Sequence, residues 1–229
     1  TYPRPPAVRP EPAEHERLPI SVAVVTYYNT PYHRGTFEIL QRRVQKLTIF
    51  LSTAMESNRT WEPDWGTLDV RIQKTSTITR PPRHSLGFRD HGIVHVPWNT
   101  KRVLREMRPD VVISAELGMR SAAAARYRAR HPDSRLILWQ NMSEHTEKER
   151  GRLRYLLRRW LLPKADAVTA NGPSGERYLR KMGVPAEKLF RVPYAAVPGI
   201  FEKLDLRRPP EGAHRLLHLG RLIDLKGVI

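Results

Sequence analysis

The run Ile20-Ser21-Val22-Ala23-Val24-Val25-Thr26 indicates the fold class most directly. It is short and rich in β-branched residues, which is typical of a parallel strand that is covered on both faces. Comparable apolar runs follow along the chain, at residues 47–51, 68–72, 111–113, 136–139 and 167–170. We therefore expect residues 20–26 to form the first strand of a parallel sheet.

Segments with helical patterns lie between these runs, at residues 36–44, 100–107, 116–130, 147–162 and 174–182. Strands that alternate with helices indicate an α/β protein with a Rossmann-like, doubly wound parallel sheet. Residues 54–67 and 80–97 are predicted to be long loops, and such loops are often functional.

The ends of the chain differ in composition from this central part. Residues 1–18 are rich in proline and charge, and we expect a disordered or extended lead-in there. Residues 19–196 are predicted to form the Rossmann-like domain. Proline and charge return between residues 193 and 212, which suits a linker over residues 197–212. Residues 213–229 would then begin a second domain that is truncated.

The chain has a large positive charge: 40 Lys and Arg against 23 Asp and Glu give a formal net charge of +17. Such a charge indicates an acidic partner, either nucleic acid, anionic lipid or a phosphorylated substrate, or else a generally basic surface. The basic residues lie on different predicted elements and match no nucleic-acid-binding module, so we expect no nucleic-acid partner. The absence of cysteine excludes disulfides, thiol nucleophiles and cysteine metal ligands.

A basic amphipathic segment covers residues 148–164. Its Leu and Trp side chains recur at helical spacing, and we expect the leucines to pack on the core, with five arginines around them: Arg150, Arg152, Arg154, Arg158 and Arg159. The helix either presents a solvated basic face or rests on anionic lipid headgroups. No apolar run reaches the ~20 residues of a membrane span, so we expect a cytoplasmic protein that is peripheral at the inner face of the membrane.

Polar and aromatic residues follow the first predicted strand, where ligands bind in open α/β sheets. Tyr28, Asn29, His33 and Gly35 belong to this loop and are predicted to face a substrate; the alternative is an ordinary strand-to-helix connection. Glu116 follows the strand at 111–113. A contact with an acceptor would explain a glutamate at this position, and so would a favourable interaction with the dipole of the following helix.

The loop after residues 136–139 contains the candidate catalytic pair. His145 is the histidine predicted to act as a catalytic or sugar-contacting group, with Glu144 as the carboxylate beside it. Ser143 or Thr146, with Glu147, would equally suit a helix cap. His91 and His95 lie in a strand or loop pattern, so we predict no metal site there.

The last twelve residues, His218-Leu219-Gly220-Arg221-Leu222-Ile223-Asp224-Leu225-Lys226-Gly227-Val228-Ile229, have the pattern of an anion site. Gly220 allows the backbone to bend sharply after a short apolar strand. Arg221 and Lys226 can then converge on one phosphate group.

This terminal pattern resembles the start of the nucleotide-sugar domain of family-four glycosyltransferases of the GT-B fold. Three earlier stretches resemble the same family, in the same order. They are Arg108-Pro109-Asp110-Val111-Val112-Ile113-Ser114, residues 164–172, and residues 183–193, which contain Gly183-Val184-Pro185 and Val192-Pro193. Tyr194-Ala195-Ala196 replaces the Asn-Gly that usually follows in that family.

The resemblance implies transfer of a sugar from a nucleotide diphosphate to a hydroxyl of a saccharide or lipid-linked acceptor, with retention, in cell-envelope polysaccharide or glycolipid synthesis. The nucleotide sugar is a substrate, and no cofactor is implied. Gly220, Arg221 and Lys226 would hold the leaving diphosphate. The donor-binding glutamates would lie beyond Ile229, so we expect the 229 residues alone to be inactive. The alternatives are a non-catalytic basic module for nucleic acid or anionic lipid, and a sugar-nucleotide epimerase of the same fold.

Overall fold

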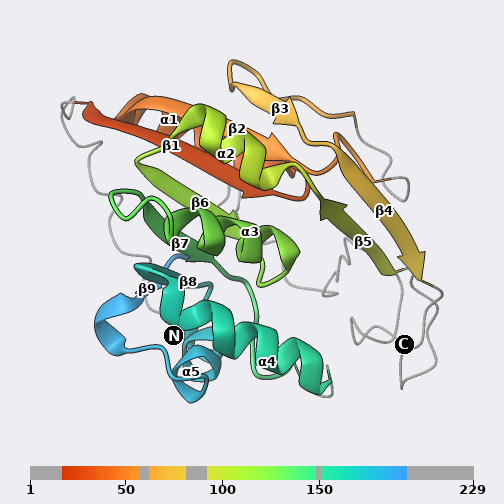
Figure 1. Cartoon of the computed structure of the whole chain (residues 1–229), viewed down its shortest axis with the longest axis vertical. Coiled ribbons are helices and arrows are strands. Elements are labelled where there is room, and N and C mark those ends of the chain that lie inside the picture. The colour runs from red at the N-terminus through yellow and green to blue at the C-terminus, as the bar shows by residue number, and fades with distance from the viewer. Residues whose placement is uncertain (1–16, 57–61, 81–91, 148–150, 195–229) are drawn as a thin grey trace, which may run out of the picture.

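The computed structural model describes residues 17–56, 62–80, 92–147 and 151–194 (Figure 1). In chain order its elements are β1 (Leu18–Thr26), α1 (Pro31–Arg43), β2 (Val44–Leu51), β3 (Val70–Ile72), β4 (Thr75–Arg80), β5 (Gly92–Pro97), α2 (Thr100–Met107), β6 (Val111–Ala115), α3 (Met119–Arg128), β7 (Arg135–Trp139), α4 (Arg152–Leu161), the short η1 (Leu162–Lys164), β8 (Ala167–Ala170), α5 (Pro173–Lys181), the short η2 (Ala186–Lys188) and β9 (Leu189–Arg191).

Seven strands form one parallel sheet in the order β3-β2-β1-β6-β7-β8-β9. In its centre, Val24 of β1 pairs with Ile49 of β2 on one side and with Ile113 of β6 on the other. The chain first builds outward from β1 to β2 and β3 and then returns to place β6 on the other side of β1. The order therefore reverses between β1 and β6, and this confirms the predicted Rossmann-like α/β fold.

Each face of the sheet has its own apolar cluster, because successive side chains of a strand point to opposite faces. Ala23 and Val25 belong to the cluster that includes residues of α2, α3, α4 and α5. Val22 and Val24 belong to the other cluster, in which Phe37 of α1 is buried. Figure 1 shows α2 and α3 in front of the sheet in this view. Since β1 is covered on both faces, its lack of polar alternation has a direct structural reason.

The structure differs from the sequence prediction at α1 and at the strands β4 and β5. Helix α1 begins at Pro31 rather than at residue 36, because Thr30 is extended and proline, with its fixed φ, suits the first helical position. Residues 80–97 were predicted to be a loop, and this prediction was wrong at both described ends: β4 and β5 pair antiparallel as a separate two-stranded sheet, with Ile78 opposite Val94. The β-branched residues of both strands favour this pairing.

Several predictions fall outside the described residues. These are the lead-in except for its last residues, the linker over 197–212, the segment 213–229, and therefore Gly220, Arg221 and Lys226. The domain boundaries and the predicted phosphate contact remain predictions.

Candidate functional site

A small hollow of about 20 Å³ lies where the carboxyl ends of β1, β6 and β7 meet. This is the point at which the strand order reverses, and it is where open α/β sheets bind ligands. The hollow is lined by Thr26, Tyr27, His33, Ala115, Glu116, Trp139, Gln140, Asn141 and Tyr194. We take it as the candidate functional site.

His33 enters the hollow from the first turn of α1. Its imidazole is 7% exposed and lies among aromatic rings, with centroids 4.7 Å from Trp139 and 5.3 Å from Tyr194. Burial lowers the pKa of His33 to about 4, so the ring is neutral at neutral pH. Its Nε2 atom has no hydrogen-bond partner in the described part of the chain.

Gln140 is the first residue after β7 and is 1% exposed. Within the residues that the structure describes, neither its side-chain oxygen nor its side-chain nitrogen has a hydrogen-bond partner. An unpaired buried polar group costs about 1–3 kcal/mol, so His33 and Gln140 together favour a bound hydroxyl or water between them. The volume of the hollow suits one such group, because a water needs roughly 10–15 Å³ by this measure.

Glu116 carries the strained backbone of the site. Its φ of 65° is left-handed, which non-glycine residues rarely adopt outside special positions. The buried guanidinium of Arg120 donates to the Ser52 hydroxyl at 2.6 Å and to the Glu116 carboxylate at 3.3 Å. Because of this conformation α3 begins at Met119, and the Glu116 side chain stays half-exposed at the mouth of the hollow.

Some lining residues were not predicted from the sequence. Tyr194 closes the hollow from the end of the described chain: its hydroxyl accepts a hydrogen bond from the Asn141 amide at 2.8 Å, and its ring lies 5.3 Å from that of Tyr32. Burial raises the pKa of both Tyr194 and Tyr27. Tyr27, Gln140 and Asn141 directly follow predicted strands, and this position is the signal that would have found them. Tyr194 was noted only as a departure from the family pattern and not as a lining residue.

The predicted substrate-facing residues do not all lie in one site. His33 and Glu116 line the hollow, Asn29 and Gly35 line a second cavity on α1, and Tyr28 is in neither lining. Tyr28 is 3% exposed and packs edge-on against Tyr27, with ring centroids 4.4 Å apart. These five residues are thus in or near the strand ends, and their contact with a substrate remains a prediction.

Glu144 and His145 lie in the turn after β7 but line neither cavity. The Glu144 carboxylate accepts hydrogen bonds from Arg177 at 2.6 and 2.9 Å and from Lys181 at 3.4 Å. The contact with Arg177 first, and that with Lys181 second, lower the pKa of Glu144. His145 is exposed. The structure does not bring this pair to the hollow, and their catalytic role stays a prediction.

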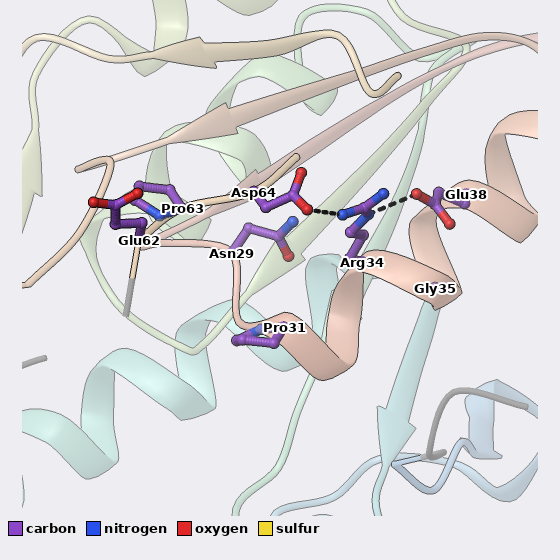
Figure 2. Close-up of a pocket in the computed structure, with 8 residues that line it drawn as sticks. All are labelled: Asn29, Pro31, Arg34, Gly35, Glu38, Glu62, Pro63 and Asp64. Carbon is purple, nitrogen blue, oxygen red and sulfur yellow. Dashed lines mark hydrogen bonds and ion pairs between the residues drawn. The ribbon is translucent and has the colours of Figure 1, made fainter. Parts of the chain in front are cut away.

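The second cavity has a volume of about 340 Å³ (Figure 2). It lies between the first turns of α1 and the loop that leads to β3, and its lining is Asn29, Pro31, Arg34, Gly35, Glu38, Glu62, Pro63 and Asp64. Within the described ranges, no three His, Asp or Glu side chains are grouped so as to hold a metal ion.

This fold, with a polar hollow at the reversal of its strand order, defines a Rossmann-like α/β domain. Residues 13–195 match the family model described as "Glycosyl transferase 4-like domain". The match covers most of the chain, so the protein belongs to this family of sugar-transfer domains.

The fold agrees with that of a solved structure from Anabaena. The chain is similar to Anabaena Alr3699/HepE, solved in complex with UDP and glucose, with 12% identity and a TM-score of 0.50 over 77% of this chain and 45% of that one. It is also similar to the UDP-GlcNAc 2-epimerase of Methanocaldococcus jannaschii, with 10% identity and a TM-score of 0.44 over 75% of this chain and 45% of that one. The chain thus spans less than half of either structure. No curated protein sequence matches it significantly.

Proposed function

We propose that the protein transfers a sugar from a nucleoside diphosphate donor to a hydroxyl of a saccharide or lipid-linked acceptor. In this reaction the bond from the anomeric carbon to the diphosphate breaks, a bond from that carbon to the acceptor oxygen forms, and the acceptor hydroxyl loses its proton. Membership of the glycosyl transferase 4-like family supports the reaction class. A nucleoside diphosphate donor is consistent with the UDP bound in the similar Anabaena structure.

The observation that carries the proposal is the hollow at the strand ends. His33 and Gln140 offer an imidazole nitrogen and an amide that lack partners in the protein, and a hydroxyl can both donate to and accept from such groups. Neutral His33 suits a hydroxyl better than an anion. We assign to this hollow the recognition of one hydroxyl at the reacting end of the acceptor or donor sugar.

The diphosphate is assigned to residues after the described part of the chain. Arg221 and Lys226 would neutralise the leaving group, with Gly220 allowing the close approach, and charge stabilisation of this kind is often the largest catalytic contribution. Retention of the anomeric configuration and a place in cell-envelope polysaccharide or glycolipid synthesis belong to the same proposal. Glu144 and His145 are its candidate catalytic pair.

The test is release of nucleoside diphosphate from a panel of nucleotide sugars, measured with the protein translated from its complete reading frame. Arg221→Ala or Lys226→Ala should reduce turnover at least about tenfold, because each removes a charge-assisted contact of roughly 1.5–3 kcal/mol. Release without transfer to acceptor, together with formation of an epimeric sugar, would favour an epimerase. No turnover with any nucleotide sugar would leave a non-catalytic binding module.

We further propose a peripheral contact between α4 and an anionic membrane surface. Leu153 and Leu156 are 84% and 60% exposed, contrary to the expectation that all the leucines of this helix pack on the core. Trp160 lies beside them, with Arg126 and Lys164 at 5.2 and 4.6 Å from its ring centroid. An apolar stripe flanked by cations fits an interface that is both apolar and negatively charged.

Arg158 does not belong to that surface. It is buried, pairs with Glu147 and donates to the Tyr178 hydroxyl at 3.1 Å, whereas Arg152 and Arg159 are exposed. Within the described residues, no helix has the length and apolar character needed to cross a bilayer. The proposed contact is therefore an interfacial one made by the exposed face of α4.

A further inference from the structure

The second cavity, lined by α1 and the loop before β3, has no role in the function described so far. Its volume of about 340 Å³ is at the lower end of the range for small-molecule pockets, about 300–1,000 Å³. Pro31, Gly35 and Pro63 give it apolar walls, and Asn29 and the charged groups give it polar ones. Apolar walls with a few convergent polar groups are typical of sites that bind small organic molecules.

The wall opposite α1 is held in place by specific contacts. Arg34 donates to Glu38 at 2.7 Å and also pairs with Asp64, and a second Asp64 oxygen accepts from the Gly66 amide at 3.0 Å. One turn further along α1, the Gln41 amide donates to the Thr67 carbonyl at 3.1 Å. The cavity is thus shaped by the folded chain itself.

Gly66 lies against the side chains that hold this wall. Its φ is +53°, which favours glycine, and a Cβ atom built on it would lie 2.7 Å from Arg34 Nη2 and 3.0 Å from Glu38 Oε1. A side chain at this position would therefore strain the backbone and make the end of the Arg34 side chain shift.

Asn29 points to a ligand. Asn29 is 4% exposed and lines the cavity, and its buried Oδ1 atom has no hydrogen-bond partner among the described residues. In Figure 2 its side chain is drawn below Asp64, with Pro63 on one side and Arg34 on the other. Buried polar atoms are normally paired, so this atom indicates a donor group that is supplied from outside the protein.

The charge of the lining limits the kind of ligand that can carry this donor group. Arg34 carries one positive charge and Glu38, Glu62 and Asp64 carry three negative charges, which leaves a formal −2 in a chain whose net charge is +17. Such a lining repels phosphates and carboxylates. Carboxylates and an amide oxygen accept hydrogen bonds, and vicinal hydroxyls donate them.

We infer that this cavity binds a sugar ring that carries no negative charge, as part of the acceptor. The inference rests on the proposed function, since it assigns the acceptor class. The apolar walls contact the C–H face of the ring, and Asn29 and the carboxylates accept from its hydroxyls. His33 and Arg34 are adjacent in α1 and line different cavities, so helix α1 contributes to both sites.

The test is a titration of the ¹⁵N-labelled chain with methyl glycosides of glucose, galactose, mannose and N-acetylglucosamine, followed by NMR. At least one neutral glycoside should shift the Asn29 side-chain amide and the Gly35 amide. The methyl glycoside of the matching uronic acid should bind at least about threefold more weakly, because of the negative lining. The inference is overturned by any of three results: absence of such shifts for all neutral glycosides, shifts confined to other residues, or equal binding of the uronate.

Two variants separate binding from folding. Asn29→Leu removes an unpaired buried polar atom, so the chain should fold and lose the glycoside at least about tenfold. Glu62→Gln, at an exposed position, should narrow the discrimination against the uronate, and Glu106→Gln on α2, far from the lining, is the matched control. Unchanged glycoside binding in Asn29→Leu, or unchanged discrimination in Glu62→Gln, would refute the assignment.

Turnover then distinguishes the two proposals. In the active protein, Asn29→Leu should raise the KM for the acceptor and leave that for the nucleotide sugar unchanged. If the variant transfers sugar with an unchanged KM for the acceptor, the cavity is not the acceptor site, and the proposal that the protein is a transferase still stands. Glycoside binding in a protein without any nucleotide-sugar turnover would keep the cavity and reject the transferase.

Discussion

Replacement of His33 by phenylalanine should make the protein less sensitive to acid. In the folded state burial holds the pKa of His33 at about 4, below the value of 6.5 in the unfolded chain. As the pH falls below 6.5, the unfolded chain binds a proton that the folded one does not yet bind, so stability is lost until the pH reaches about 4. Phenylalanine keeps a ring among Phe37, Trp139 and Tyr194 and removes this proton linkage.

The magnitude follows from the two pKa values. Each pKa unit corresponds to about 1.4 kcal/mol, so at pH 5 the linkage amounts to roughly 2 kcal/mol. Solvent that reaches part of the ring reduces this, and we expect about 1–2 kcal/mol between pH 7.5 and pH 5. At pH 7.5 the variant should be as stable as the wild type or more so, because an unpaired Nε2 atom is removed.

The assay is urea unfolding at pH 7.5 and pH 5, followed by tryptophan fluorescence. The loss of unfolding free energy between the two pH values should be smaller for His33→Phe than for the wild type by the amount given above. His145→Gln, at an exposed histidine, serves as the control and should follow the wild type. An identical pH dependence in the wild type and His33→Phe would refute the reasoning that His33 is buried and neutral.

Two further predictions concern the loop before β3 and helix α4. Gly66→Ala should lower the free energy of unfolding by about 1–2 kcal/mol because of the positive φ at this position, and it should displace Arg34. Gly183→Ala is the control: its φ is +89° and the space around it is open, so it reports the backbone contribution alone. Equal losses of unfolding free energy in the two variants would show that the contact with Arg34 contributes nothing to stability. The protein should co-sediment with anionic but not with neutral vesicles, and less of it should pellet as the salt concentration rises. The double change Arg152→Gln and Arg159→Gln should weaken the affinity for anionic vesicles about tenfold or more, at roughly 1 kcal/mol per charge. The double change Leu153→Ser and Leu156→Ser should also weaken vesicle binding, and Ile78→Ser on β4 is the control. If none of the changes in α4 alters the amount of protein that pellets, the membrane contact is rejected.

Most strands of the sheet could be predicted from the sequence, although β9 was not. The runs at 20–26, 111–113, 136–139 and 167–170 lie in β1, β6, β7 and β8, because a strand that is covered on both faces must be apolar throughout. The alternation of these runs with helices was sufficient for the fold class. The sequence also located the loops at the strand ends, and in them His33 and Glu116.

Only the tertiary structure decided which of these residues meet. Local periodicity reports how a segment is buried, but not which distant segment lies beside it. Neighbours in sequence therefore separate: His33 and Arg34 line different cavities, and Glu144 turns to Arg177 and Lys181 on α5. Tyr194 and Tyr27 lie far apart in the chain and line one hollow, because the parallel register of the sheet brings the strand ends to one edge.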